Sequence, residues 1–212
     1  MHYLFDMDGV LVNSGPVTRK AALEVLRTYG VEAKEEDFRP FVGAGEARFV
    51  GGVAEKYGVP YEPAMKDKTY EIYLNYVQND LVVYPNTKRV LEALVARGDT
   101  VSLVSSADYI KIEANMKTAG ISLDMFSVII SGSDVSRKKP FPDIFQKAVE
   151  KLGASPHECL VVEDAINGIQ AAKEAGIPCA VVTTSFTRER LVEENPDYVI
   201  DDLKELLDLF AS

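Results

Sequence analysis

The stretch YLFDMDGVLVNS, residues 3–14, carries the pattern that determines the fold of this chain. It opens with three apolar residues and turns abruptly polar at Asp6, Asp8 and Gly9. A short apolar run that ends in a polar turn is typical of a strand buried on both faces of a parallel sheet. In open α/β sheets, ligands bind beyond the carboxyl ends of the strands. The stretch therefore predicts a buried first strand that brings acidic side chains to a ligand site.

The second half of the chain supplies the other strands of this sheet. Short apolar runs occur at residues 101–104, 126–130, 160–162, 179–182 and 198–200. Helical patterns lie near residues 87–97, 109–118, 141–152, 165–175, 187–194 and 202–211. Alternating short strands and helices indicate a parallel sheet that is covered on both faces. We therefore predict the α/β class, with a Rossmann-like parallel sheet as its core.

The segment between the first strand and this alternating region has a different pattern. Helical periodicity covers residues 16–29, 46–57 and 61–77, with almost no strand signal. The first strand would have no partner unless it joined the later sheet, so the helical segment must be an insertion. We predict an α/β catalytic core of residues 1–13 and 85–212, and an inserted α-helical cap of residues 14–84.

Composition excludes several classes of function. The 212 residues are 47% hydrophobic and 26% charged, with a net charge of −10 and no Lys/Arg cluster. Nucleic acids and anionic membranes need a basic face, so neither is an expected partner. Cys159 and Cys179 lie in apolar runs without disulfide or metal-ligand spacing, which is typical of small buried hydrophobes. No cationic leader or long apolar stretch occurs, so we expect a cytoplasmic protein, by default a monomer.

The predicted strands end in residues that carry chemistry. The second strand ends in Ser105-Ser106 and the fourth in Glu163-Asp164, while Lys139 follows the third. We expect these side chains to meet Asp6 and Asp8 at one edge of the sheet. The four carboxylates and Lys139 together contribute −3 to the net charge. Clustered carboxylates repel one another unless a cation compensates them, and their hard oxygen atoms suit Mg²⁺. The sequence therefore predicts a magnesium site at this edge.

Such a set of groups is suited to phosphoryl transfer. An aspartate compensated by Mg²⁺ can attack phosphorus as a covalent nucleophile, and a second carboxylate two residues later can act as general acid and base. A lysine and a hydroxyl can hold the phosphoryl oxygens, on which charge is spread in the transition state.

Four motifs in the chain resemble those of the haloacid dehalogenase (HAD) superfamily. Residues 5–14, FDMDGVLVNS, resemble its first motif, Asp-x-Asp-Gly-Val-Leu, and residues 104–106 resemble its second. Residues 139–143, KPFPD, resemble the third motif, and residues 161–168, VVEDAING, the fourth. The motifs occur in the order of the superfamily, and any one alone would be a weak signal.

The resemblance implies a role for each of these residues. Asp6 would be the phosphorylated nucleophile and Asp8 the general acid/base. Ser105 would donate a hydrogen bond to the phosphoryl group, with Ser106 as the competing candidate for this position, and Lys139 would neutralise its charge.

The resemblance also implies a ligand set for Mg²⁺. Asp164 and Asp6 would bind the metal through their side chains, and Asp8 through its backbone carbonyl. Glu163 would contact the metal directly or through a neighbouring ligand.

The helical insertion resembles the small cap of the subfamily that contains β-phosphoglucomutase and many sugar-phosphate phosphatases. Such caps place a loop over the leaving group, and here that loop is the glycine-rich stretch of residues 41–46. The stretch is not a nucleotide-binding fingerprint, because no predicted strand precedes its glycines. Gly43, Glu46 and Arg48 are therefore candidates for substrate binding. The alternative is that this loop only caps a helix.

Three residues depart from the pattern of this subfamily. Asn13 stands where an aspartate is usual, Lys138 where a glycine often precedes the catalytic lysine, and Asn86 where a glycine commonly follows Pro85. Asn13 would alter a hinge or a supporting hydrogen bond, and Lys138 adds charge near the phosphate site.

The resulting prediction is a Mg²⁺-dependent phosphomonoester hydrolase that acts on a small phosphorylated metabolite, such as a sugar or polyol phosphate. The alternative is a phosphotransferase like β-phosphoglucomutase, in which an arginine of the cap loop stands at the position of Glu46. A dehalogenase of this superfamily would lack Asp8, and an inactive binding module would have lost Asp6, Asp8 or Lys139.

Overall fold

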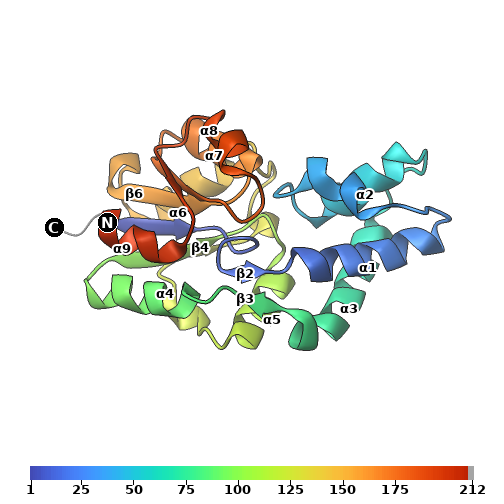
Figure 1. Cartoon of the computed structure of the whole chain (residues 1–212), viewed down its shortest axis with the longest axis horizontal. Helices are drawn as coiled ribbons and strands as arrows, with labels where there is room; N and C mark the ends of the chain where they lie inside the picture. The colour runs from blue at the N-terminus through green and yellow to red at the C-terminus, as the bar shows by residue number, and fades with distance from the viewer. Residues whose placement is uncertain (210–212) are drawn as a thin grey trace.

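Strand β1 (His2–Phe5) lies near the middle of a six-stranded parallel sheet with the order β5-β4-β1-β6-β7-β8. The structure is a computed structural model and describes residues 1–209. The other strands of the sheet are β4 (Thr100–Val104), β5 (Ile129–Ile130), β6 (Cys159–Glu163), β7 (Cys179–Val182) and β8 (Tyr198–Ile200). This topology confirms the predicted α/β fold with a parallel sheet (Figure 1).

The register of β1 with its two neighbours aligns the ends of three strands. Phe5 pairs with Leu103 of β4 on one side and with Val162 of β6 on the other. The Asp6 N–H continues this ladder by donating a hydrogen bond to the Val162 carbonyl at 2.9 Å. Residues that follow β1, β4 and β6 therefore emerge at the same edge.

Helices cover both faces of this sheet. One face carries α4 (Thr87–Ala96), α5 (Tyr109–Ala119) and α9 (Leu206–Leu209), and the other carries α6 (Asp143–Leu152), α7 (Ile166–Glu174) and α8 (Arg188–Val192). Side chains alternate along a strand, so Tyr3 and Phe5 of β1 pack into the first hydrophobic core and Leu4 into the second. Short 3₁₀ turns span Leu123–Met125, Gly132–Asp134, Pro156–Glu158 and Leu203–Glu205.

Two of the predicted elements that differ in extent are β5, the strand at one edge of the sheet, and the helix that follows β8, the strand at the other edge. The strand predicted at residues 126–130 covers only Ile129–Ile130, because the 3₁₀ turn before it ends with the Phe126 N–H bonded to the Leu123 carbonyl. The helix predicted at residues 202–211 is a 3₁₀ turn followed by the single helical turn α9, and residues 210–211 lie outside the described part of the chain.

The segment between residues 14 and 81 forms a separate helical layer with its own core. It contains α1 (Gly15–Thr28), the 3₁₀ helix Glu35–Phe41, α2 (Glu46–Lys56) and α3 (Pro63–Asp80), and these helices extend beyond one end of the sheet (Figure 1). Their buried contacts include Leu26, Phe38, Val53 and Met65. We call this helical segment the cap; its limits at residues 14 and 84 stay a prediction.

Two short strands that the sequence did not predict join the cap to the sheet. β2 (Val12–Asn13) and β3 (Val82–Val83) pair antiparallel, with Val12 opposite Val83. Strands of two residues are too short to show an alternating pattern. This ribbon holds both crossing points of the chain side by side.

The two cysteines, Cys159 and Cys179, are buried, as predicted, and both are free thiols. Among the helices of residues 1–209, none combines the length and the apolar character needed to traverse a bilayer.

Candidate active site

Asp6 and Lys139 form a buried ion pair at the carboxyl end of β1. The Lys139 Nζ donates to Asp6 Oδ1 at 2.6 Å and to the Val104 carbonyl at 3.2 Å. It also donates to Glu163 Oε1. Burial alone would lower the pKa of Lys139, but the charges of Asp6 and Glu163 outweigh this and hold the pKa above its ordinary value. The lysine therefore stays charged beside the predicted nucleophile.

A cluster of carboxylates surrounds this lysine. Asp6, Glu163 and Asp164 each offer an oxygen atom, and these atoms lie within 4.8 Å of one another. Burial raises the pKa of Asp6 to about 7 even though Lys139 acts in the opposite direction. Burial, followed by the charges of Glu163 and Asp6, raises the pKa of Asp164 as well. One ammonium does not compensate three carboxylates, so the donor set fits a divalent cation with a preference for oxygen ligands, such as Mg²⁺.

Two glycines make room for carboxylates of this cluster, because a glycine has no Cβ atom. Gly9 has φ +86°, and a Cβ at this position would overlap the Asp164 carboxylate. A Cβ on Gly168, in the first turn of α7, would overlap the carboxylate of Glu163. The glycines of the first and fourth motifs thus allow the carboxylates to pack against backbone.

The Asp8 carboxylate does not belong to this cluster. Its Oδ2 accepts a hydrogen bond from Lys111 Nζ at 2.9 Å, and its Oδ1 accepts from Ser14 Oγ and from Asn115 Nδ2, the latter at 3.4 Å. Lys111 also donates to Glu46 Oε1 at 2.7 Å, across the boundary between core and cap. Asp8 is therefore oriented toward the cap.

Sequence reasoning missed Ser14, Lys111 and Asn115. The sequence does carry a signal for two of these residues. Lys111 and Asn115 are four residues apart, so they share one face of α5 with the buried residues Ile112 and Met116. Polar residues on an apolar helical face require partners when buried, and the partner here is Asp8.

The two serines that follow β4 differ in their hydrogen bonds. Ser105 is buried and its Oγ accepts from the Ala107 N–H at 3.2 Å. The Ser106 Oγ is buried too, and within residues 1–209 no group is in hydrogen-bond contact with it. Both serines line the same cavity, and Ser106 is the one with an unused hydroxyl.

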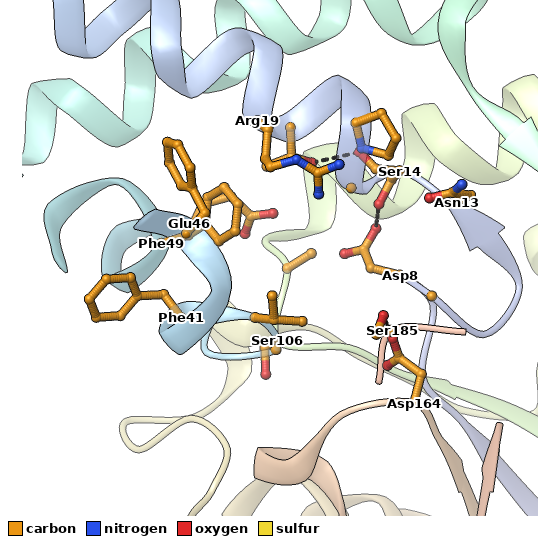
Figure 2. A pocket seen from close by; sticks show the side chains of 18 of the residues that line it. Asp8, Asn13, Ser14, Arg19, Phe41, Glu46, Phe49, Ser106, Asp164 and Ser185 are labelled. Carbon is orange, nitrogen blue, oxygen red and sulfur yellow. Dashed lines mark hydrogen bonds between the residues drawn. The ribbon is translucent and has the colours of Figure 1, made fainter. Parts of the chain in front are cut away.

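This cavity lies between the strand ends and the cap and has a volume of about 520 Å³ (Figure 2). The core contributes Asp6, Asp8, Ser105, Ser106, Lys111 and Asp164 to its lining, whereas Lys139 and Glu163 are buried and do not line it. The cap contributes Gly43 and Glu46, together with charged and aromatic residues that were not predicted: Arg19, Glu35, Glu36, Phe38, Arg39, Phe41 and Phe49.

The cap loop is seated on the core. Asn167 Nδ2 donates to the Val42 carbonyl at 3.0 Å, and a Cβ on Gly43 would come within 3.1 Å of the Ala165 Cβ. Glu46 is buried at the cavity wall. The loop thus does more than cap α2.

Arg48 does not reach the cavity, unlike the other predicted cap residues. It is two positions after Glu46 on α2, and a rotation of about 100° per residue places it on the opposite side of the helix. Its guanidinium pairs with Glu55 at 2.7 Å in an exposed position. The structure therefore places Arg48 outside the candidate site.

The three residues that depart from the subfamily pattern each have a defined place in the structure. Asn13 lines the cavity from β2. The Lys138 Nζ donates to the Ser106 carbonyl at 3.1 Å and to Asp108 at 3.4 Å, which fixes the backbone next to the predicted phosphate site. Asn86 donates to both carboxylate oxygens of Asp202, at 2.9 and 2.7 Å.

Several known proteins are similar to this chain in sequence or in fold. Residues 3–182 match the family described as haloacid dehalogenase-like hydrolase. Protein SUPPRESSOR OF QUENCHING 1, chloroplastic, from Arabidopsis thaliana is 42% identical over 204 residues, which are 94% of this chain and 19% of that protein. A phosphoglycolate phosphatase from Yersinia pestis is 32% identical over 209 residues, covering 96% of this chain and 90% of the relative. The crystal structure of a hydrolase from Pseudomonas syringae has a TM-score of 0.87 at 23% identity and covers 100% of this chain and 99% of that one.

The chain therefore belongs to the haloacid dehalogenase-like hydrolase family, as its four motifs predicted. Within that family, its relatives include the phosphoglycolate phosphatase from Yersinia pestis. Its fold is also that of the crystal structure of β-phosphoglucomutase from Clostridium difficile, which has a TM-score of 0.84 at 21% identity and covers 97% of this chain and 92% of that one.

Proposed function

We propose that this chain is a Mg²⁺-dependent phosphomonoester hydrolase that acts on a small phosphorylated metabolite, such as a sugar or polyol phosphate, through an aspartyl-phosphate intermediate. The observation that carries the proposal is the ion pair of Asp6 and Lys139 at the base of a cavity that Asp8 also lines. The cavity, at about 520 Å³, has room for a small metabolite.

In the first half-reaction, an Asp6 carboxylate oxygen forms a bond to phosphorus while the bond from phosphorus to the leaving oxygen breaks. Asp8 gives its proton to that oxygen, so the product leaves as a neutral alcohol. Lys139 and the hydroxyl of Ser105 or Ser106 stabilise the negative charge on the phosphoryl oxygens.

In the second half-reaction, Asp8 accepts a proton from water while the water oxygen attacks the phosphorus of phosphorylated Asp6. The bond from phosphorus to the Asp6 oxygen breaks, which regenerates the carboxylate and releases phosphate. Asp8 holds a proton again, so each turnover leaves the protein unchanged.

Asp6, Asp164 and the Asp8 backbone carbonyl would hold Mg²⁺, with Glu163 beside them. When bound, Mg²⁺ supplies positive charge that offsets the repulsion between the carboxylates and an anionic phosphate. Glu163 also accepts a hydrogen bond from Lys139 and so holds that lysine in place.

The cap would exclude bulk water and select the substrate. In support, residues 14–84 contribute Gly43 and Glu46 to the cavity wall opposite the strand ends. The phosphoglycolate phosphatase from Yersinia pestis, by its name, acts on a small phosphorylated compound and matches this chain over most of its length. A monomeric state and a cytoplasmic location stay predictions, and the plant relative is designated chloroplastic.

A phosphotransferase like β-phosphoglucomutase is not favoured. Arg48, the nearest arginine after Gly43 in the sequence, lies outside the cavity, and Glu46 is already bonded to Lys111. Incubation with β-glucose 1-phosphate and a bisphosphate primer should accordingly yield free phosphate rather than glucose 6-phosphate if this compound is turned over.

The proposal is tested with a panel of phosphorylated metabolites and the aryl ester p-nitrophenyl phosphate, each assayed for phosphate release with Mg²⁺ and with EDTA. We expect release that requires Mg²⁺ and that Asp6→Asn abolishes, because an amide oxygen is a poor nucleophile. Full activity of Asp6→Asn would disprove the nucleophile assignment, and full activity in EDTA would disprove the metal requirement. The same assay with Asp67→Asn, an exposed carboxylate of α3, is the matched control.

A further inference from the structure

Lys111 is a buried cation that the reaction steps above do not use. Its side chain, on α5, is 3% exposed, and its Nζ lies 2.9 Å from Asp8 Oδ2 and 2.7 Å from Glu46 Oε1. Burial would lower the pKa of Lys111, but the charges of Asp8 and Glu46 outweigh it and hold the pKa above the ordinary value. A buried ammonium is costly unless it is paired, and this one joins a carboxylate of the core to a carboxylate of the cap.

Both carboxylate oxygens of Glu46 are already hydrogen-bonded in this arrangement. Its Oε1 accepts from Lys111, and its Oε2 accepts from the Tyr70 hydroxyl at 2.8 Å. Tyr70 in turn accepts a hydrogen bond from the Asp108 N–H at 3.1 Å, which ties α3 of the cap to the start of α5. The geometry therefore supports a role for Glu46 in holding Lys111.

A second connection runs from the cap to the same carboxylate. The Tyr73 hydroxyl of α3 donates to Asn115 Oδ1 at 2.6 Å, and Asn115 Nδ2 lies 3.4 Å from Asp8 Oδ1. Both Asp8 oxygens therefore contact a side chain that a cap residue fixes. Figure 2 shows Asp8 and Glu46 extending into the cavity from its two sides.

We propose that Lys111 is a positioning residue for Asp8, and that Glu46 is the cap residue that fixes Lys111, so that Asp8 has its proton-transfer orientation only while the cap is closed. Withdrawal of the cap would remove Glu46 and Tyr73 and leave Lys111 and Asn115 without the contacts that orient them. Proton transfer needs a donor held at hydrogen-bond distance from the leaving oxygen, so the closed cap would couple substrate enclosure to catalysis. This inference rests on the proposed function.

The test compares two aryl phosphates of similar shape whose leaving groups differ in their need for a proton. The p-nitrophenolate ion leaves without protonation, whereas phenolate is a poorer leaving group that benefits from it. For Lys111→Met we expect kcat/KM for phenyl phosphate to fall by about 10- to 100-fold, and to fall much less for p-nitrophenyl phosphate. KM should change little, because Lys111 acts through Asp8, and Lys111→Arg should restore part of the loss.

Glu46→Gln provides an independent variant that retains the shape of the side chain. It should show the same dependence on the leaving group with a smaller loss, since the amide oxygen still contacts Lys111 without a charge. Lys66→Met is the matched control, because Lys66 also pairs a cap helix with the core, at 2.7 Å to Asp108, but forms no hydrogen bond or ion pair with Asp8 or Lys111 in residues 1–209. We expect this control to leave both kcat/KM values unchanged.

An equal loss on both substrates for Lys111→Met and Glu46→Gln would assign these residues a structural role and overturn the inference. So would unchanged kinetics in both variants. If the unsubstituted enzyme released no phosphate from any phosphomonoester, the proposed function itself would fail, which is a different outcome from an active enzyme with unaffected variants.

Discussion

The Nζ atom of Lys139 lies 2.6 Å from Oδ1 of Asp6, although 133 residues separate the two in sequence. The parallel sheet creates this proximity, because Asp6 directly follows β1 and Lys139 also contacts the carbonyl of Val104, the last residue of the neighbouring strand β4. The same ammonium contacts Glu163 at the end of β6. One cation therefore links the ends of three adjacent strands.

Removal of Lys139 should therefore destabilise the fold as well as abolish activity. Lys139→Met leaves Asp6 and Glu163 buried without their common partner, and breaking a buried ion pair in this way costs about 3–5 kcal/mol. Urea denaturation in EDTA measures the change in the free energy of unfolding. Lys147→Met, which removes a partly exposed pair with Asp134, should change it by less than about 1 kcal/mol. Equal losses in the two variants would contradict the structural role of Lys139.

Mg²⁺ should raise the melting temperature of the protein, because a ligand that binds only the folded state stabilises it. Asp164→Asn should eliminate this Mg²⁺-dependent increase. The same substitution should raise the melting temperature in EDTA, since it removes one of three buried carboxylates that repel one another. Differential scanning fluorimetry with and without Mg²⁺ measures both effects. A Mg²⁺ response of normal size in Asp164→Asn would place the metal elsewhere.

Ser105 and Ser106 should differ in their effect on stability. Ser106→Ala removes a buried hydroxyl that has no hydrogen-bond partner in residues 1–209, so the melting temperature should stay the same or rise. Ser105→Ala loses the contact with the Ala107 N–H and should lower the stability by about 1 kcal/mol. If Ser106 binds the phosphoryl group, Ser106→Ala should also lower kcat/KM by about 10- to 100-fold, as expected for a hydrogen bond to a charged group. Unaltered kinetics of Ser106→Ala would leave Ser105 as the phosphate ligand.

Gly168→Ala should displace the Glu163 carboxylate, because the new methyl group would overlap it. We expect a loss of both phosphatase activity and Mg²⁺-dependent stabilisation, measured by phosphate release and by thermal melting. Gly15→Ala, in the first turn of α1, is the control, since a Cβ there meets the flexible end of Arg19 at 3.2 Å and the Asn13 side chain at an ordinary contact distance of 3.9 Å. A fully active Gly168→Ala would show that Glu163 tolerates another position.

The stability of the cap should depend on the ionised form of Asp37. Hydrogen bonds from Lys56, from the Lys34 N–H and from Tyr57 hold the pKa of Asp37 below its ordinary value. A carboxyl group whose pKa is lower in the folded state stabilises the fold above its unfolded pKa of about 3.9, and this contribution is lost as the pH falls further. Asp37→Asn should thus lower the melting temperature at neutral pH, and its difference from the unsubstituted protein should shrink below about pH 4.

Glu36→Gln is the control for this experiment, because Glu36 is an exposed neighbour of Asp37 on the same 3₁₀ helix. It should melt like the unsubstituted protein at both pH values. A pH-independent deficit in Asp37→Asn would show that hydrogen-bond geometry, rather than charge, is what Asp37 contributes.

The sequence allowed the sheet and most of the strand-end residues to be predicted because the relevant information is local. The apolar run of residues 3–5 identifies a buried strand, and Asp6 directly follows it. The carboxyl ends of parallel strands meet at one edge. Identifying the strands was therefore sufficient to predict that Asp6, Ser105 and Glu163 lie close together. Position along the strand, not long-range packing, decides where these side chains lie.

The cap side of the site could not be predicted in this way. Arg48 and Glu46 are two residues apart on α2, yet one is exposed to solvent and the other lies at the cavity wall, and only the packing of that helix decides which. The contact of Lys111 with Glu46 joins residues 65 positions apart and depends on how the cap is seated on α5. A helix can be docked with any of its faces toward a neighbour, whereas a strand in a parallel sheet has one direction and one register.

The sequence alone thus determined the class of fold, the family and the acidic edge at which we propose that phosphate is bound. Only the tertiary structure decided that Asp8 is oriented toward the cap and held there through Lys111 and Asn115. The physical reason is that buried polar side chains must find partners, and in this protein the partners come from helices whose relative placement is set by long-range packing.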